Sequence, residues 1–319
     1  MAHKLLKPKV EVPLPALERK KIAPLRPAEF KPAVRAISAL LIGLCGQPKS
    51  GKTRSALRLA TGLARGGPIA MLDTEGGRGL AYAPPPGKDP VPGKSFTFAH
   101  YLFEPPHSPQ RFRNAVVAAC ALRPRVIIVD SVTHEWEGKG GMLAMVDDAG
   151  GGFRAFKGPR NDHLDFMNTV TSVPCHFIFC VRLKERHDQV KVQGKWEIVN
   201  LGWRTNCDGS VPYDMTVNLS LKRGGVIRDP EKPGIDFENE DIWAIPDFFD
   251  DVIQPNKQID EALGEALAAW CAPPKEWEED EHSAGTACDS VADIDSTSST
   301  VETTEGDRGT DDRQTDPTT

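Results

Sequence analysis

The sequence predicts an α/β fold in which a mainly parallel central sheet is flanked by helices, with disordered tails at both ends. Three observations predict this fold. A glycine-rich phosphate loop lies between an apolar run and an amphipathic run, further short apolar runs alternate with helical patterns downstream, and both ends of the chain are polar. Strand and helix patterns that alternate in this way are typical of parallel sheets covered by helices.

Composition divides the chain into three predicted parts. Residues 1–36 are a basic, proline-rich arm with nine Lys and Arg against three Asp and Glu, and residues 37–272 are the predicted domain that contains the phosphate loop. Residues 273–319 are an acidic tail with three Lys and Arg against fourteen Asp and Glu, and they cannot build a core. We expect the arm to contact nucleic acid or a neighbouring subunit, or to be a solvated leader. The tail either competes for a basic surface or only keeps the protein soluble.

Apolar content and cysteine spacing limit the class of protein. At 319 residues and 39% hydrophobic composition, the chain can bury a sizeable core. It has neither a run of about eighteen apolar residues nor an apolar N-terminal leader, so we expect a cytoplasmic protein with no membrane partner. Its seven cysteines are scattered without the spacing of a zinc site, and we expect reduced thiols.

The phosphate loop is the element on which the functional prediction depends. Residues 46–53 match the pattern GxxxxGK[ST], after an apolar run over 37–45 and before an amphipathic helix over 53–65. Lys52 is expected to reach the β- and γ-phosphates of ATP, and the Thr53 hydroxyl to bind Mg²⁺. The predicted nucleotide-binding residues are Gly46, Gln47, Pro48, Lys49, Ser50, Gly51, Lys52 and Thr53.

A second apolar run, over residues 125–130, predicts a strand that ends at Asp130. In P-loop enzymes an aspartate in this position helps to hold Mg²⁺ (the Walker B motif), so Thr53 and Asp130 are the predicted metal ligands. Lys52 and Asp130 are 78 positions apart, which leaves room for an intervening strand and helix of a parallel sheet.

The residue that activates water must lie elsewhere in the sequence, because Ser131 follows Asp130. Glu75 is the best candidate, since it follows a predicted strand over 69–72 and neighbouring parallel strands lie about 5 Å apart. Glu135 and Glu137 remain rivals, and Glu75 is alternatively a turn residue of a glycine-rich loop. The predicted catalytic residues are therefore Lys52, Glu75 and Asp130.

The rest of the domain is predicted from hydrophobic periodicity and turn residues. It comprises a loop over 84–94, helices over 108–122, 161–171 and 259–270, strands over 175–183 and 213–221, and a hairpin over 190–199. The hairpin is a lid, a DNA-binding loop or a subunit contact, and the sequence does not separate these roles.

Two basic segments are candidate sensor or DNA contacts. Residues 153–160 interleave aromatic and basic side chains, which suits base stacking and phosphate neutralisation, although the Phe residues also suit docking on the core. Cations at the end of the strand over 175–183 suit a γ-phosphate sensor or a DNA backbone contact. The candidates are Arg154, Lys157, Arg160, Arg182, Lys184 and Arg186.

The motifs over 73–76 (Asp-Thr-Glu-Gly) and 129–131 (Val-Asp-Ser) resemble the core of RecA-type recombinases. The string over 130–138, followed by Gly-Gly-Met-Leu at 140–143, is similar to phage-encoded RecA-like ATPases of the single-strand annealing and recombination type. The resemblance covers residues 37–225. It implies a RecA-like P-loop NTPase core that uses ATP and Mg²⁺, with Glu75 in catalysis, and that couples hydrolysis to single-stranded DNA.

The resemblance also sets the expected partners and their limits. They are single-stranded DNA and further copies of the chain, with a single-strand DNA-binding protein as another candidate, in the host cell cytoplasm for a phage-encoded protein. No additional DNA-binding domain is recognisable, so full strand exchange is not implied. A P-loop small-molecule kinase with a lid over 182–204, or a nucleotide-gated packaging or scaffold component, is an alternative.

Overall fold

The computed structural model of the protein describes residues 33, 36–37, 39–192, 195–229 and 245–271. The predicted acidic tail over 273–319 lies outside these residues, as does the predicted arm over 1–36 apart from positions 33 and 36. The division into arm, domain and tail therefore stays a prediction. Every described helix and strand lies in the compact unit that begins at Ala36.

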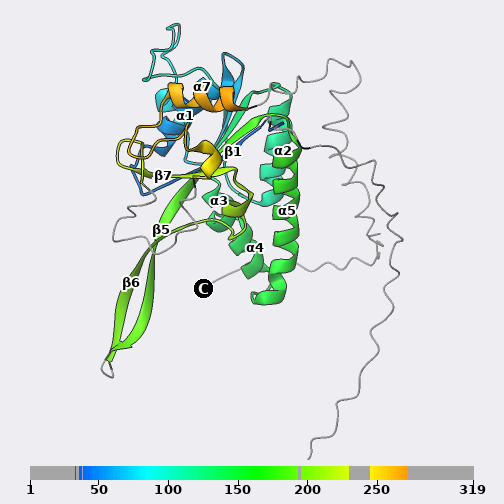
Figure 1. Ribbon diagram of the computed structural model, residues 1–319. Coiled ribbons are helices and arrows are strands. Elements are labelled where there is room, and N and C mark those ends of the chain that lie inside the picture. Colours follow the sequence, from blue (N-terminus) through cyan, green and yellow to red (C-terminus); the bar gives the residue numbers. More distant parts are fainter. Residues whose placement is uncertain (1–32, 34–35, 38, 193–194, 230–244, 272–319) are drawn as a thin grey trace, which may run out of the picture. The chain divides into compact units, whose positions relative to one another are not determined.

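One mainly parallel sheet organises the domain (Figure 1). Its strand order is β3-β2-β4-β5-β1-β7-β8, and β6 pairs with β5 outside this path. All pairings among the first six strands in that order are parallel, whereas β5–β6 and β7–β8 are antiparallel. The strands are β1 Leu41–Gly46, β2 Ile69–Asp73, β3 Ala99–Leu102, β4 Val126–Asp130, β5 His176–Val192, β6 Lys195–Thr205, β7 Val217–Lys222 and β8 Val226–Ile227. The predicted fold class, an α/β fold with a mainly parallel central sheet, is confirmed.

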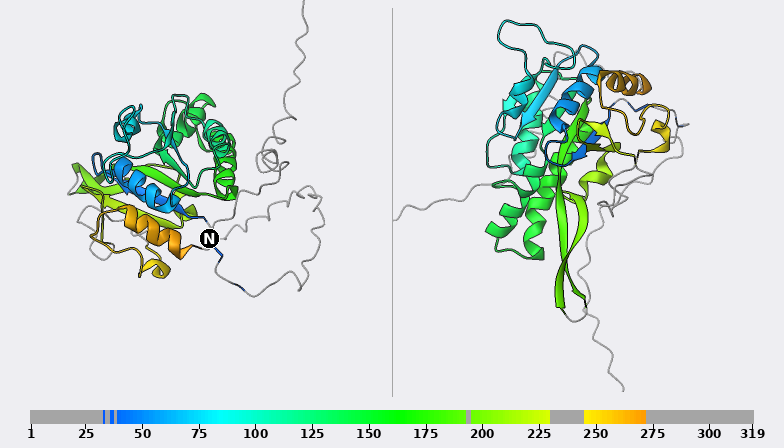
Figure 2. Two further views of the ribbon diagram at one scale, coloured as in Figure 1. Left: turned by 90° about the horizontal axis from the view of Figure 1, so that it is seen from above. Right: turned by 90° about the vertical axis from the view of Figure 1, so that its left-hand side faces the viewer.

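Helices cover both faces of the sheet (Figure 2). Along β4, Ile127 and Val129 join the apolar cluster under α2 and α5, while Val126 and Ile128 join the cluster under α1 and α7. This alternation follows from the two-residue period of a strand, and burial on both faces explains why β4 is apolar up to Asp130. The α-helices are α1 Lys52–Ala64, α2 Pro109–Cys120, α3 Thr133–Glu137, α4 Met142–Asp148, α5 Lys157–Ser172, α6 Val211–Asp214 and α7 Glu261–Trp270.

Short 3-10 helices complete the described elements: η2 Arg78–Tyr82, η3 Phe153–Phe156 and η5 Asp247–Phe249. Within the described ranges, no helix has the length and apolar character needed to cross a bilayer. The six cysteines in those ranges form no disulfide with one another.

Five predicted elements have different bounds in the structure. The strand over 175–183 and the first arm of the hairpin are one long strand, β5, which pairs with β6 from Leu183 opposite Thr205 outward. The predicted strand over 213–221 starts only at Val217, because α6, with a proline in its first turn, occupies the preceding residues. The helix predicted from 259 begins at Glu261, since the Asp260 side chain caps it by accepting from Leu263 N at 2.9 Å. The helix predicted from 161 begins earlier, at Lys157.

Candidate active site

The phosphate loop joins the buried end of β1 to the first turn of α1. Gly51 has φ +99°, a left-handed conformation, and a Cβ there would lie 3.1 Å from Gly225 N. Lys49, also in the loop, has φ +62°. The helix begins at Lys52, so its free N–H groups and the positive end of its dipole face the loop. This arrangement suits an anion such as a nucleotide phosphate.

Two side chains in the first turn of α1 connect the parts of the site. The Lys52 ammonium donates to the carbonyl oxygens of Gly46 (2.8 Å) and Gln47 (3.1 Å), so it lies across the loop. The Thr53 hydroxyl donates to Oδ2 of Asp130 at 2.6 Å, although the two residues are 77 positions apart. The phosphate loop is thereby joined to the carboxyl end of β4.

Asp130 is almost fully buried, and burial raises the pKa of its carboxyl group to about 6. The hydrogen bond from Thr53 acts in the opposite direction and favours the carboxylate. The peptide bond between Asp130 and Ser131 is cis. With a pKa of about 6, the carboxyl group is mostly ionised near neutral pH, and acidification through that value protonates it.

Thr74 ties the end of β2 to the end of β4. Its backbone N–H donates to Asp130 O at 2.8 Å, and its hydroxyl accepts from Ser131 N at 2.7 Å. Asp73 is fully buried and shapes the loop that comes after β2, since its carboxylate accepts from the backbone N–H groups of Glu75 (2.7 Å) and Gly79 (2.8 Å). These bonds place Glu75 beside Asp130.

Glu75 is paired with a residue 107 positions later in the sequence. The Arg182 guanidinium donates from Nε to Oε1 at 2.8 Å and from Nη2 to Oε2 at 2.6 Å. A second arginine, Arg78, approaches Oε2 only to 3.7 Å. The predicted base and one predicted sensor residue therefore meet directly.

The predicted catalytic and metal-binding residues share one cavity of about 730 Å³. Lys52, Thr53, Glu75, Asp130 and Arg182 all line it. Its further lining residues are Pro48, Lys49, Gly51, Arg78, Ala81, Tyr82 and Leu183. Sequence reasoning missed Arg78 and Tyr82, which come from η2, and the only signal was an arginine three positions after Glu75 in a glycine-rich loop.

Comparison with known proteins agrees with this geometry. The profile of a family described as "AAA domain" matches residues 38–240, which is more than half of the chain. The chain belongs to this family. With its phosphate loop, Asp130 and shared cavity, this AAA domain is a P-loop ATPase.

Other comparisons add little to the assignment of the AAA domain. Among curated proteins no relative matches. A similar solved structure is the flagellar accessory protein FlaH from Methanocaldococcus jannaschii, at 13% identity and a TM-score of 0.28, over 56% of this chain and 82% of that chain.

The two rival bases, Glu135 and Glu137, lie outside the cavity that Lys52 and Asp130 line. Glu135 is fully buried, its Oε1 lies 2.8 Å from His163 Nδ1, and burial raises the pKa of its carboxyl group. Glu137 accepts hydrogen bonds from Lys184 and Asn206. Neither residue lines the cavity, so the structure favours Glu75 as the base.

The six cationic candidates separate into different places in the AAA domain. Arg182 faces the nucleotide cavity, and Lys184 lies 3.2 Å from the Glu137 carboxylate. Arg186 lies in β5, but its side chain is not among those described. The other three are exposed, on η3 and the first turn of α5: Arg154, Lys157 and Arg160.

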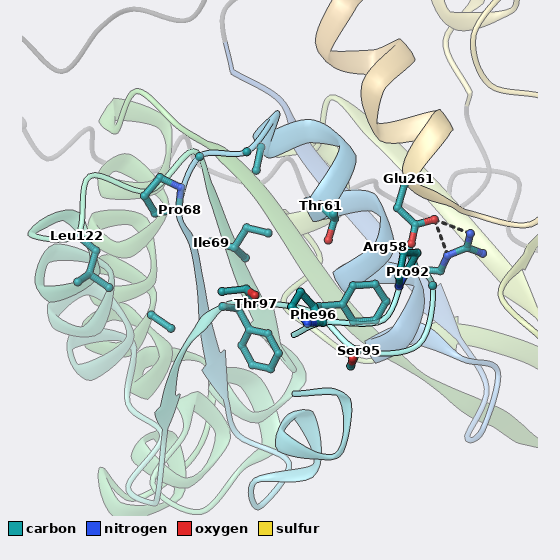
Figure 3. Close-up of a pocket in the computed structure, with 17 residues that line it drawn as sticks. Arg58, Thr61, Pro68, Ile69, Pro92, Ser95, Phe96, Thr97, Leu122 and Glu261 are labelled. Carbon is teal, nitrogen blue, oxygen red and sulfur yellow. Dashed lines mark hydrogen bonds and ion pairs between the residues drawn. The ribbon is translucent and has the colours of Figure 1, made fainter. Parts of the chain in front are cut away.

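A larger cavity, of about 1000 Å³, lies away from the phosphate loop (Figure 3). It is mostly apolar, with Ile69 and Phe96 in its wall and the Arg58–Glu261 ion pair on one side. None of the predicted site residues lines it. This cavity is the larger of the two, but the smaller one is the candidate active site because the anion-binding loop and the carboxylates line it.

Proposed function

We propose that this AAA domain hydrolyses ATP with Mg²⁺ and acts on single-stranded DNA, in phage-type recombination, annealing or replication, as a homo-oligomer. The observation that supports the nucleotide chemistry most directly is the 2.6 Å contact between Thr53 and Asp130, in the cavity that Lys52 and Glu75 also line. A single-strand DNA-binding protein is a further proposed partner.

The residues present fit Mg²⁺. The Thr53 hydroxyl and the Asp130 carboxylate are oxygen donors, which Mg²⁺ prefers, and two protein ligands leave its other positions for phosphate and water. In the part of the chain that the structure describes, no cluster of three or more His, Cys, Asp or Glu side chains suits a metal held by protein alone. When bound, the ion would neutralise phosphate charge.

The side chains in the cavity can divide the work of hydrolysis. Glu75 accepts a proton from water as the water oxygen forms a bond to the γ-phosphorus. The bond from that phosphorus to the β,γ-bridging oxygen breaks, and its electron pair stays on ADP. Lys52 offsets the negative charge of the phosphates. Thr74 and Asp73 hold the loop that carries Glu75 in position.

Binding of the magnesium–nucleotide complex should weaken in mild acid. Because burial raises the pKa of Asp130 to about 6, lowering the pH through that value protonates a metal ligand. We expect Mg²⁺-dependent affinity to fall about fourfold between about pH 7.5 and about pH 5.5, as the carboxylate fraction falls. Asp130→Asn is the control, because its amide does not titrate and any remaining pH dependence comes from protonation of the nucleotide itself. Identical pH profiles for parent and variant would exclude Asp130 as the titrating ligand.

Exposed aromatic and basic side chains support the DNA proposal. Phe156 docks against Trp136, with ring centroids 6.4 Å apart, but Phe153 is 94% exposed beside Arg154. On the hairpin, Trp196 is 69% exposed and lies opposite Lys191 in register. Bases stack on exposed rings and phosphates attract the cations. The hairpin and the first turn of α5 both extend past the same edge of the sheet, the edge at which the parallel strands have their carboxyl ends (Figures 1 and 2).

A triple alanine variant at Arg154, Lys157 and Arg160 should weaken binding to single-stranded DNA. We expect affinity at low salt to fall at least about tenfold, and the slope of log affinity against log salt to shrink by about two, because fewer counterions are released. The measurement is a titration of labelled oligonucleotide between about 50 mM and about 200 mM salt. A matched control removes three exposed cations elsewhere: Lys88, Lys94 and Arg123.

The outcome separates the proposal from its alternatives. Equal slopes for the triple variant and its control would remove this segment from the DNA site. ATP turnover measured with and without single-stranded DNA tests the function as a whole. A kinase would require an acceptor molecule, and a scaffold component would show no response to DNA.

A further inference from the structure

Both oxygens of the predicted catalytic base are occupied in the structure. The Glu75 side chain is 13% exposed, and each carboxylate oxygen accepts a hydrogen bond from the Arg182 guanidinium. Two parallel bonds of this kind form the strongest geometry available to a carboxylate and an arginine. A general base must offer an oxygen to the attacking water. The pair takes one acceptor site on each oxygen and offsets the negative charge of the carboxylate, so Glu75 is a weaker acceptor for water while the pair is closed.

The Arg182 guanidinium faces the cavity where the phosphates of ATP would bind. Arg182 lies opposite Gly46, the first residue of the phosphate loop, in the register of β5 and β1. It lines the same cavity as Lys52 and Thr53. A γ-phosphate carries more negative charge than a carboxylate and has three oxygens, so it is a strong competitor for the guanidinium.

Only the side chain of Arg182 needs to move. Its backbone N–H donates to the Thr133 hydroxyl at 2.9 Å, and its carbonyl accepts from Asn206 N at 2.9 Å. The flanking residues, Val181 and Leu183, are buried in the core. The Arg182 side chain is 40% exposed and lines the cavity. Arg78 does not offer the same clamp, because its side chain is 80% exposed and 3.7 Å from Glu75.

We propose that Arg182 is a γ-phosphate-sensing positioning residue, which clamps Glu75 until the γ-phosphate of ATP takes the guanidinium and releases the carboxylate. This inference rests on the proposed ATPase function. Its consequence is that ATP and Glu75 compete for one cation, whereas ADP, which lacks the γ-phosphate, leaves the pair closed. Binding of a γ-phosphate therefore favours the open pair, and a closed pair weakens binding of the γ-phosphate.

A double-mutant cycle on binding tests the clamp. The probes are ADP and the β,γ-imido analogue of ATP, each with Mg²⁺, and the proteins are the parent, Glu75→Gln, Arg182→Ala and the double variant. We expect Glu75→Gln to tighten binding of the analogue about fivefold or more, with ADP affinity changed by less than about twofold. In the Arg182→Ala background, Glu75→Gln should give little further tightening.

The cycle separates the clamp from simple charge repulsion and from failure of the site. If Glu75→Gln tightens analogue binding equally with and without Arg182, repulsion alone explains it and the clamp is wrong. No tightening at all in the parent background also overturns it, provided that thermal unfolding shows a folded variant. Arg182→Lys keeps the charge but not the paired geometry. In that background, Glu75→Gln should tighten analogue binding less than in the parent and more than in Arg182→Ala. A parent protein that binds neither probe would instead refute the proposed nucleotide site.

Discussion

Replacing Lys52 with alanine should reduce ATP turnover at least about a hundredfold, because the ammonium group is the charge that the phosphate loop offers to the β- and γ-phosphates. The structure adds a detail that the motif does not contain. Lys52 is not merely solvated, since its ammonium donates to the carbonyls of Gly46 and Gln47. Turnover and nucleotide binding are measured together, at saturating Mg²⁺.

The fold should survive the loss of Lys52. Each of its two hydrogen bonds contributes about 1 kcal/mol, which is small against a typical stability of about 5–15 kcal/mol. The Tm is then expected to fall by about 2–4 °C for each kcal/mol lost. Lys88→Ala, which removes an exposed lysine from the loop before β3, is the matched control. A Lys52→Ala protein with parental turnover would show that this loop is not the ATP site.

Glu75→Gln should bind ATP but hydrolyse it at least about a hundredfold more slowly, the effect of losing a general base. The amide keeps the shape of the side chain and one acceptor for Arg182, but it cannot take a proton from water. Single-turnover measurements separate this loss from weaker binding, because the variant remains saturable with ATP.

Glu135→Gln is the informative comparison for Glu75→Gln. Glu135 is buried against His163 and is not in the cavity, so its replacement should lower the Tm and change turnover by less than about tenfold. The opposite pattern, slow hydrolysis by Glu135→Gln at an unchanged Tm, would show that Glu135 is the base.

Local sequence patterns account for the elements of the site. Four fixed positions over 46–53 predict the loop, and an apolar run that ends in Asp130 predicts β4, because glycine spacing and strand periodicity are properties of neighbouring residues. Where an element ends depends less on neighbouring residues. Hydrophobic pattern predicts the end of β5 near 183, where burial ends, but pairing with β6 carries the strand on to Val192. Strand length outside the core depends on a partner strand rather than on hydrophobic pattern.

Strand order was decided only by the tertiary structure. The predicted room between Lys52 and Asp130 is filled by β2 and β3, yet both lie on the far side of β4. The strand between β1 and β4 is β5, which comes after both in sequence. That order brings Arg182 to Glu75, and it leaves Glu135 in the core with His163. The sequence by itself determined the loop, its helix and the strand that ends in Asp130, since these depend on short-range spacing. Which distant side chains meet there depends on how strands are ordered across the sheet, and no local periodicity encodes that order.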